Sequence, residues 1–373
     1  MNIGIDGRAA KWYRGTGIGT YTYQLISNIN NIDNINDYLL FLPQNTDLEL
    51  NSNFSVKPIE ESPNSNFWDE VNAPNILNNT DIELYHVPQN GVGLAENINC
   101  LKTITLHDII PLRMPETVSD RYLNIFNNQL PRIIENCDGI ITVSEFSKDD
   151  IAKEFNFPKD KIFVTYLGAE DIYKPLDKTL CKEFLKNKYN IDKNFLLYVG
   201  GYSPRKNIVG ILEAFSLLDS KLRENLSVVI TGKKGISYNI YMKRAEDLGI
   251  KNSVIFTDFI PLDHLPLFYN ACEFLVYPSF YEGFGLPPLE AMACGTPVIA
   301  SNVTSVPEIC SGSALLVDPY NVDELSLSMK ALLSDNKLRN SMIKYGLSNC
   351  LKYSWANTAK DTIAAYENII KNE

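Results

Sequence analysis

The stretch that decides the fold is VYPSFYEGFGLPPLEAMACGTPVIASNVTSVPE, residues 276–308. It predicts a buried strand over 274–277, a loop broken by Gly283 and Gly285, a helix over 287–293 and a second buried strand over 297–300. Proline just inside a helix start and glycine just past its end is the usual asymmetry of helix termini. The stretch is therefore typical of one strand, loop and helix unit of a parallel α/β sheet.

Two carboxylates, Glu282 and Glu290, bracket this loop and the first turn of its helix. A loop that leads into a helix N-terminus presents bare backbone N–H groups, and such groups bind anions. Carboxylates on either side supply acceptors for the hydroxyls of a sugar or a ribose. We therefore expect this unit to hold a phosphorylated, hydroxyl-rich ligand. A role for Glu290 as only a partner of the helix dipole stays open.

Length and composition predict a globular protein with two domains of ordinary size. The chain has 373 residues, of which 45% are hydrophobic and 21% are charged, and one core rarely grows that large. Lys and Arg number 34 against 45 Asp and Glu, so the net charge is -11. Nucleic acid is not an expected partner, because phosphate backbones require a cationic surface.

The seven cysteines are widely spaced and include no CxxC pair. Zinc sites and disulfide frameworks need closer patterning, so free thiols in a reducing compartment are expected. No stretch approaches the ~18 apolar residues of a membrane span, and residues 1–4 resemble the start of a strand rather than a signal peptide. These features predict a cytoplasmic protein, with peripheral contact to the inner face of the membrane left open.

Strands and helices alternate in both halves of the chain, which predicts two doubly wound parallel α/β domains. The predicted strands cover residues 3–6, 38–42, 81–88, 103–106, 139–143, 163–166, 195–199, 227–231 and 254–257, besides the two in the opening stretch. Helices are predicted over 122–136 and from Ser144, the expected N-cap, to about 155, and residues 8–19 are interpreted as a glycine-bearing loop. The segment GAEDIYKPLDK, residues 168–178, is polar and contains a proline, so we place the boundary there, with domains 1–170 and 171–373. The last helix, about 355–373, is amphipathic and is a candidate to pack back on the first domain.

Candidate site residues in the first half follow strand ends. His107 and Asp108 come directly after the strand at 103–106, and carboxyl ends of strands line the ligand crevice of open α/β sheets. His107 is the candidate general acid/base or transition-state donor, whereas Asp108 would orient a loop or bind acceptor hydroxyls. Gly17 lies in the glycine loop GTGIGT, which allows close approach of a ligand or forms only a tight turn. His86 sits in an apolar segment and is interpreted as structural.

Arg205 and Lys206 are the candidate anion-binding pair of the second half. They stand after the strand at 195–199 and two glycines, where a helix over 207–218 is predicted. Arginine offers a planar fork and lysine a point charge to a phosphate. A solvated basic pair is the alternative, but cations at a helix start oppose the helix dipole. No G-x-S-x-G elbow and no G-x-x-x-x-G-K-[ST] loop is present in the sequence.

These motifs together resemble the retaining glycosyltransferases of family 4, which have the GT-B fold of two Rossmann-like domains facing across a cleft. The resemblance covers nearly the whole chain. It rests on GTGIGTY (15–21), HDIIPLRMPE (107–116), VSEFSKDDI (143–151), VGGYSPRKN (199–207) and PSFYEGFGLPPLEAMACGTPVIAS (278–301). The last segment matches the family's E-x7-E motif with Glu282 and Glu290.

The resemblance implies that a nucleotide-sugar donor binds the C-terminal domain. Glu290 would accept hydrogen bonds from the ribose, Arg205 and Lys206 would neutralise the diphosphate, and Glu282 would lie beside the donor sugar. His107 would face the reacting centre from the N-terminal domain. The implied catalytic residues are His107, Asp108 and Glu282. The implied donor-binding residues are Gly17, Arg205, Lys206, Ile260, Gly283, Phe284, Gly285, Leu286 and Glu290. Residues 259–261 match the place where the family's backbone contacts the base, and the N-terminal domain, residues 1–170, would bind the acceptor.

The mechanism implied by the resemblance needs neither a metal nor a cofactor. Fixed cations and helix-terminal N–H groups can stabilise the charge that develops on the departing phosphate, and the sequence contains no D-x-D motif. Retaining hydrolases use a carboxylate nucleophile. Families like this one are thought to have the acceptor attack on the leaving-group face, so Glu282 is not assigned as a nucleophile.

The segments HDIIPLRMPE and VSEFSK resemble the subset of bacterial mannosyl- and related transferases that build surface polysaccharide. This resemblance makes GDP-mannose the leading donor and a surface-polysaccharide or lipid-linked glycan the expected acceptor. UDP-glucose, UDP-GlcNAc and dTDP- or UDP-rhamnose stay open as donors. A nucleotide-sugar epimerase, a phosphorylase and a non-catalytic sugar-nucleotide-binding subunit stay open as other functions.

Overall fold

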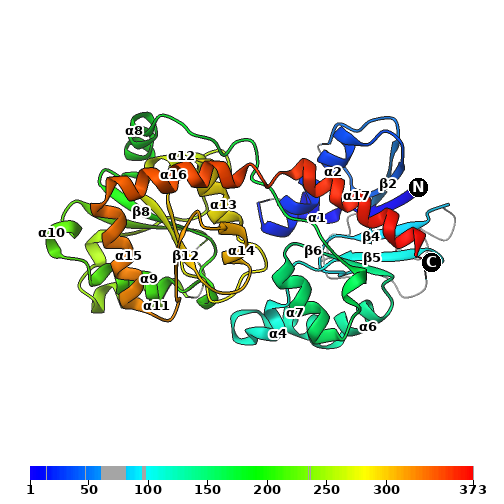
Figure 1. The fold of residues 1–373 in the computed structure, drawn as a ribbon, viewed down its shortest axis with the longest axis horizontal. Helices are drawn as coiled ribbons and strands as arrows, with labels where there is room; N and C mark the ends of the chain where they lie inside the picture. The colour runs from blue at the N-terminus through cyan, green and yellow to red at the C-terminus, as the bar shows by residue number, and fades with distance from the viewer. Residues whose placement is uncertain are drawn as a thin grey trace. The chain divides into compact units, whose positions relative to one another are not determined.

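The computed structural model of the chain is drawn in Figure 1. It describes residues 1–13, 15–46, 48–59, 81–94, 98–233, 235 and 237–372. The chain divides into two compact units: Met1–Leu167 with Ser354–Glu373 form unit 1, and Gly168–Tyr353 form unit 2. The polar linker predicted at residues 168–178 thus begins where unit 2 begins.

Unit 1 contains a parallel sheet that, in the described part of the chain, has seven strands in the order β3-β2-β1-β4-β5-β6-β7. The strands are β1 (Asn2–Asp6), β2 (Asp37–Pro43), β3 (Phe54–Ile59), β4 (Leu84–Val87), β5 (Leu101–Thr105), β6 (Gly139–Thr142) and β7 (Ile162–Val164). In the register, Ile3 of β1 pairs with Tyr38 on one side and Leu84 on the other. The strand order reverses between β1 and β4, and ligands of open α/β sheets bind beyond the carboxyl ends at such a point.

Helices cover both faces of this sheet, as the doubly wound prediction requires (Figure 1). They are α1 (Arg8–Trp12), α2 (Gly17–Ile32), α4 (Ile110–Arg113), α5 (Asp120–Asn128), α6 (Leu130–Glu135), α7 (Glu145–Phe155) and α17 (Trp355–Lys371). The predicted cap of α7 is confirmed, since the Ser144 side chain accepts a hydrogen bond from the Ser147 N–H. The helix predicted over 122–136 is instead two helices, because Pro131 lacks an N–H and clashes with the preceding turn.

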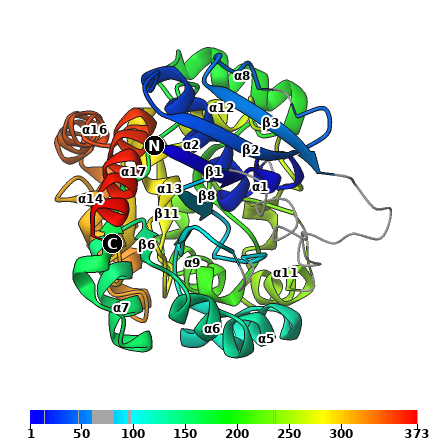
Figure 2. The same cartoon turned by 90° about the vertical axis from the view of Figure 1, so that its right-hand side faces the viewer.

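The terminal helix α17 packs within unit 1, alongside α2 (Figure 2). His86 anchors it: Nδ1 lies 2.7 Å from the Tyr366 hydroxyl, and Nε2 lies 2.8 Å from the Thr105 hydroxyl. Burial lowers the pKa of His86 to about 3, so the ring is neutral. A Cβ on Gly139 of β6 would lie 2.7 Å from Ile369, so only glycine leaves room for α17 there. The structural interpretation of His86 is thus confirmed.

Unit 2 contains a second parallel sheet, six-stranded in the described residues, in the order β10-β9-β8-β11-β12-β13. Its strands are β8 (Asn194–Val199), β9 (Leu226–Thr231), β10 (Val254–Phe256), β11 (Phe274–Tyr277), β12 (Val298–Ser301) and β13 (Leu315–Val317). The central strands are continuous apolar runs because helices bury them on both faces. The order reverses between β8 and β11, which places the expected ligand site at the carboxyl ends of these two strands.

Figure 1 shows α8, α12, α13 and α16 on one face of this sheet and α9, α11 and α15 on the other. The helices are α8 (Lys178–Tyr189), α9 (Ile208–Ser216), α10 (Ser220–Arg223), α11 (Tyr238–Asp247), α12 (Leu265–Ala271), α13 (Leu286–Ala293), α14 (Val306–Cys310), α15 (Val322–Ser334) and α16 (Asn336–Cys350). The prediction of two doubly wound α/β domains is confirmed by the two sheets and their helices.

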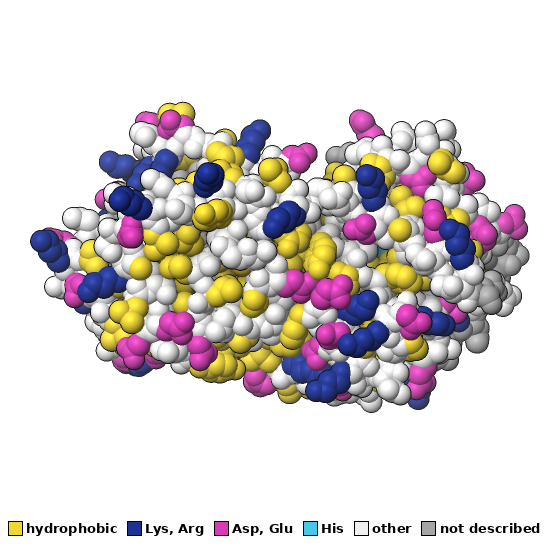
Figure 3. All heavy atoms as spheres, in the orientation of Figure 1, with side chains coloured by type: hydrophobic (Ala, Val, Ile, Leu, Met, Phe, Trp, Pro, Cys, Tyr) yellow, Lys and Arg dark blue, Asp and Glu magenta, His cyan; other side chains and the backbone are white. Residues whose placement is uncertain are grey.

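Charges of both signs are interspersed over the face drawn in Figure 3, and Lys and Arg do not gather into one broad patch there. The seven cysteines are free thiols. Within the ranges given above, no helix combines the length and the apolar character that crossing a membrane requires.

Candidate active site

The loop between β11 and α13 is shaped by Gly285. Its φ of +117° lies in the left-handed region that favours glycine, and it forms the N-cap of α13 without a capping side chain. Pro287 and Pro288 follow within the first turn and carry no N–H. Ser305 Oγ donates to the carbonyls of Glu282 and Phe284, both at 2.9 Å, and fixes the loop. Among the first residues of this helix start, Phe284, Gly285 and Leu286 carry backbone N–H groups, and their binding of an anion stays a prediction.

Glu282 lies buried between the two predicted cations. Its carboxylate is 2.7 Å from Arg205 Nη1 and 2.6 Å from Lys206 Nζ. Lys206 Nζ also donates to the Tyr277 hydroxyl at 2.8 Å. Burial opposes ionisation of Glu282, but the charges of Arg205 and Lys206 outweigh it and lower the pKa of Glu282 to about 2. The structure therefore brings Arg205, Lys206 and Glu282 together as one charged cluster at the carboxyl ends of β8 and β11.

The turn after β8 sets the position of the two cations. Pro204–Lys206 form a 3₁₀ turn, and α9 begins only after Asn207, whose side chain accepts from the Gly210 N–H. Gly232, at the end of β9, has a φ of +142°, and a Cβ there would lie 2.0 Å from the Gly200 carbonyl oxygen. Only glycine allows the loops after β8 and β9 to touch. The cations thus precede α9 rather than stand within its first turn.

Replacing Glu282 with glutamine is expected to separate nucleotide binding from transfer. The carboxylate pairs with both Arg205 and Lys206, so its neutralisation removes a negative charge that would compete with a diphosphate for these two cations. We expect nucleoside diphosphate affinity to rise several-fold, while turnover falls about 100-fold or more because a charge beside the reacting sugar is lost. Calorimetry and initial rates measure the two effects.

Glu273→Gln is the matched control for that variant. Glu273 also binds several cations, with Lys178 Nζ at 3.2 Å and Arg339 Nη1 at 3.2 Å, but it precedes β11 and so lies at the opposite end of that strand. The Glu273→Gln variant should change neither the affinity for nucleoside diphosphate nor the turnover. A fall in nucleotide affinity in Glu282→Gln would show that Glu282 is not a competing counterion.

Glu290 lies on α13 with partners different from those of Glu282. Its carboxylate accepts from the Tyr269 hydroxyl at 2.7 Å. Burial raises the pKa of Glu290 to about 7, the charge of Glu170 adds to this, and hydrogen bonds from Tyr269 and Tyr173 oppose it. The residue itself is partly exposed. Glu282 and Glu290 therefore have different partners and opposite pKa shifts: the pKa of Glu282 is lowered to about 2 and that of Glu290 is raised to about 7.

Donor affinity is expected to increase with pH around neutrality. Only ionised Glu290 accepts hydrogen bonds with both oxygens, so affinity should rise about tenfold from about pH 6 to about pH 8. Because the folded pKa lies above the unfolded one, the same group makes unit 2 lose stability as pH rises through 7. Nucleotide titration at several pH values checks the first effect. Glu290→Gln should bind weakly with a flat profile, and an unchanged slope would contradict the assignment.

Ile260 is buried at 6% exposure, next to the exposed Phe259. Its side chain packs in the core of unit 2, which leaves only its backbone as a candidate contact for a base. Tyr202 holds the end of β10 by donating to the Thr257 carbonyl at 3.0 Å. The contact of this backbone with a base stays a prediction.

In unit 1, His107 is held in one orientation. The ring nitrogen Nε2 lies 3.1 Å from the Pro88 carbonyl oxygen, and the backbone N–H of His107 donates to Asn90 Oδ1 at 2.9 Å. The ring packs edge-on against that of Tyr21, with the ring centroids 4.6 Å apart. Burial lowers the pKa of His107 to about 4, so the ring is neutral. A carbonyl only accepts, so Nε2 carries the proton and Nδ1 is an acceptor. Of the predicted roles, general base fits Nδ1 of this tautomer, whereas the Nε2–H is directed at the Pro88 carbonyl.

Asp108 and Gly17 have simpler surroundings. Asp108 Oδ1 accepts from the Ile110 N–H at 3.0 Å, which starts α4 and matches the loop-orienting role. Gly17 is exposed as the first residue of α2, after the Thr16 cap. A Cβ at Gly17 would meet nothing within 4 Å, so packing inside unit 1 does not require glycine there.

A buried charged pair at the end of β1 was not predicted from the sequence. Arg8 Nη2 lies 2.6 Å from Asp6 Oδ2, and both side chains are 1% exposed. Gln89 donates to the same oxygen at 2.5 Å. A Cβ on Gly93 would lie 2.3 Å from the Arg8 guanidinium, so glycine is needed beside it. The available signal was an aspartate at a strand end with an arginine two residues later.

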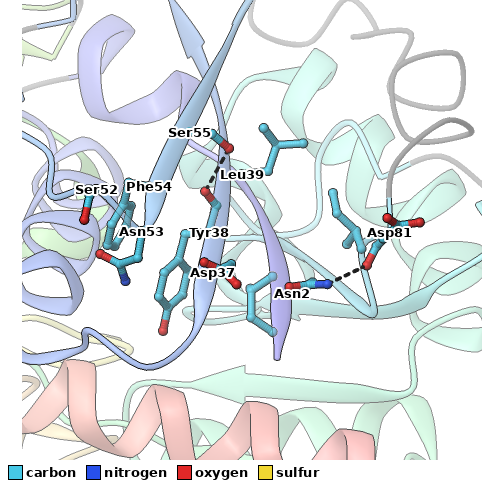
Figure 4. A pocket seen from close by; sticks show the side chains of 11 residues that line it. Asn2, Asp37, Tyr38, Leu39, Ser52, Asn53, Phe54, Ser55 and Asp81 are labelled. Carbon is cyan, nitrogen blue, oxygen red and sulfur yellow. Dashed lines mark hydrogen bonds between the residues drawn. The ribbon is translucent and has the colours of Figure 1, made fainter.

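A pocket of about 250 Å³ lies at the amino-terminal ends of β1 and β2 (Figure 4). Its polar side chains are engaged locally: Asn2 Nδ2 donates to the Asp81 carbonyl, and Ser55 Oγ donates to the Tyr38 carbonyl. None of the predicted site residues, all in the described part of the chain, lines it. Ligands of open α/β sheets bind at the carboxyl ends, so we assign this pocket no function.

Comparisons with known proteins show the family of the chain. Residues 182–348 match the family model of glycosyl transferases group 1, and residues 16–171 match that of glycosyltransferase family 4. O-antigen chain mannosyltransferase B of Escherichia coli is 35% identical over 263 residues, which are 70% of this chain and 69% of that protein. Serotype-specific mannosyltransferase WbdA of Escherichia coli is 29% identical over 283 residues, 74% of this chain but 35% of that longer protein.

Among solved structures, HepE of Anabaena in complex with UDP-glucose is similar, with a TM-score of 0.74 and 17% identity over 99% of this chain and 100% of that one. This likeness concerns the fold. Together with the family models and the relatives, it establishes that the chain belongs to glycosyltransferase family 4 and is a GT-B glycosyltransferase similar to bacterial O-antigen mannosyltransferases.

Proposed function

We propose that the protein is a retaining, metal-independent transferase that moves a hexose from a nucleotide-sugar to a surface-polysaccharide or lipid-linked glycan. The observation that supports this proposal best is the cluster of Arg205, Lys206 and Glu282 at the carboxyl ends of β8 and β11. Mannose from GDP-mannose is the proposed donor, supported by relatives named as O-antigen mannosyltransferases. The proposed location is the cytoplasm, on the inner face of the membrane where a lipid-linked acceptor is used.

Each proposed role follows from the chemistry of the group. As the bond from the sugar to the diphosphate breaks, negative charge grows on the departing phosphate, and Arg205 and Lys206 stabilise it together with the N–H groups at the start of α13. Glu290 accepts from the ribose hydroxyls. Ionised Glu282 lies beside the sugar as it becomes oxocarbenium-like. The acceptor oxygen attacks on the leaving-group face and its proton passes to the departing phosphate, so no carboxylate nucleophile is assigned.

UDP-glucose is the second donor candidate, because HepE, which shares the fold, is in complex with it. UDP-GlcNAc and dTDP- or UDP-rhamnose have no specific support. An epimerase would act on the donor without an acceptor, a phosphorylase would need inorganic phosphate, and a non-catalytic subunit would release no nucleotide. These differences define the test.

The test is product analysis with each donor, with and without a lipid-linked glycan extract. We expect nucleoside diphosphate release that depends on the extract, greatest with GDP-mannose, and an α-linked product from the α-linked donor. Equal turnover without acceptor would indicate an epimerase or hydrolase. A β-linked product would overturn retention, and transfer that persists unchanged in EDTA would support metal independence.

Replacing His107 with alanine is expected to lower turnover about 100-fold or more, because its Nδ1 would accept a hydrogen bond from a hydroxyl at the reacting centre and hold that group in the reactive orientation. Donor affinity should stay within a factor of about two, because the donor groups belong to unit 2. Rates and nucleotide titration separate the two effects. His264→Gln is the matched control, since His264 binds Tyr189 within unit 2 and has no proposed role. Unchanged turnover in His107→Ala would remove His107 from the mechanism.

A further inference from the structure

Two aromatic rings form a stacked pair at the rim of the unit 2 site. The ring centroids of Phe280 and Tyr320 are 4.7 Å apart, with an interplanar angle of 27°. Phe280 is partly buried, whereas Tyr320 is 74% exposed. One face of the Tyr320 ring is therefore covered by Phe280 and the other is open to solvent. In the described residues its hydroxyl has no hydrogen-bond partner.

The loop that carries Tyr320 is fixed by hydrogen bonds. The Tyr320 N–H donates to Asp318 Oδ1 at 2.9 Å, and the Asn321 N–H donates to the Asp318 carbonyl at 3.0 Å. Asn207, which is buried, donates through Nδ2 to the Pro319 carbonyl at 2.7 Å. The exposed ring is thus pre-organised, so little side-chain entropy is lost when a ligand packs on it.

The pair lies next to the reacting end of the site. The Phe280 N–H donates to the Arg205 carbonyl at 2.9 Å, and Arg205 Nη1 donates to the Tyr281 carbonyl at 2.7 Å. Phe280 is two residues before Glu282. Tyr320 follows β13, whereas Ile260, the proposed base contact, follows β10 at the opposite edge of the same sheet. The position therefore favours a sugar over the nucleotide base as the ligand of Tyr320.

We propose that the Phe280–Tyr320 pair is a subsite that stacks a hexose ring of the glycan acceptor, an inference that rests on the proposed transferase function. The C–H face of a pyranose is apolar and packs flat against an aromatic ring, while its rim hydroxyls stay hydrated. The unpartnered Tyr320 hydroxyl supplies one polar contact at the edge. The subsite would hold a sugar of a growing chain beside the group that is transferred.

The kinetic test compares Tyr320→Ala, Tyr320→Phe and the control Tyr345→Ala, a tyrosine on α16 that is 59% exposed. Loss of one stacked ring should raise the KM for a glycan acceptor about tenfold in Tyr320→Ala. The donor KM and the kcat at saturating acceptor should stay within about twofold. Tyr320→Phe should keep most of the acceptor affinity, and Tyr345→Ala should match the wild type.

A binding test uses mannotriose and maltotriose with nucleoside diphosphate present, read by saturation-transfer NMR. Sugar signals present in the wild type and weakened in Tyr320→Ala support the subsite. A raised donor KM with an unchanged acceptor KM in Tyr320→Ala would show that the ring binds the donor instead. If both the kinetics and the NMR signals of Tyr320→Ala equal those of the wild type, the subsite proposal is wrong, although the proposed transferase function is not affected. If no nucleotide-sugar is turned over by the wild type, the proposed function fails. The NMR comparison then still decides whether Tyr320 binds a sugar.

Discussion

Lys206→Ala is expected to lower turnover about 100- to 1,000-fold, the effect of removing one pre-organised group that stabilises a developing negative charge. Lys206 Nζ lies in a largely buried cluster, 2.6 Å from the Glu282 carboxylate and 2.8 Å from the Tyr277 hydroxyl. A charge in such surroundings acts more strongly than one in water. Nucleoside diphosphate affinity should fall as well, because the diphosphate is charged before and after transfer. Initial rates with saturating donor and calorimetry measure the two losses.

Lys243→Ala is the matched control. Lys243 also pairs with a carboxylate, Asp247 at 2.7 Å, but it lies on the outer surface of α11 with its side chain 70% exposed. Its removal should change neither rate nor affinity. If Lys206→Ala kept wild-type turnover, the diphosphate would have to bind elsewhere and the assignment of the cluster would be wrong.

The second large effect is expected in unit 1, where Asp6→Asn should lower the free energy of unfolding by about 3–5 kcal/mol, the usual effect of breaking a buried ion pair. Burial disfavours the charge of Arg8, but Asp6 outweighs it and raises the pKa of Arg8. Without the Asp6 charge, the guanidinium is an uncompensated buried cation. Urea unfolding monitored by hydrogen exchange in unit 1 peptides measures the loss.

The same variant should also slow transfer. Gln89 donates to Asp6, and its neighbour Pro88 provides the carbonyl that fixes His107. Arg8→Met combined with Asp6→Asn should be less destabilised than Asp6→Asn alone, because the buried charge is gone. The control Asp247→Asn, in an exposed pair, should unfold like the wild type. A stability for Asp6→Asn equal to that of the control would show that the pair contributes nothing.

Much of the fold could be predicted because its central strands are buried on both faces and form continuous apolar runs. The runs ending at Val199 and Tyr277 are examples, and both were assigned within one residue of the observed bounds. The edge strand β3 (Phe54–Ile59) could not be found this way, since half of its residues are exposed and it contains Pro58. The short helix α1 (Arg8–Trp12) was interpreted as part of the glycine-bearing loop over 8–19. A helix of this length is too short to show a periodic pattern of apolar residues.

The site could be predicted only in part. Arg205 and Glu282 follow neighbouring parallel strands, and because such strands end at one edge of a sheet, their convergence was foreseeable. The sequence does not show that Glu282 pairs with both cations. The tyrosines around Glu290 and the Asp6–Arg8 pair depend on contacts between distant segments, which have no local pattern.

Nucleotide binding to unit 2 is the most direct test of the proposed donor site. Thermal shift with GDP, UDP, dTDP and ADP should show that one nucleoside diphosphate raises the Tm of the wild type, since a ligand that binds only the folded state stabilises it. The matching nucleoside without phosphates should raise it far less. The double variant Lys206→Ala/Glu290→Gln should lose the shift. A shift of equal size in the double variant, or no shift with any of the four, would contradict the proposed site.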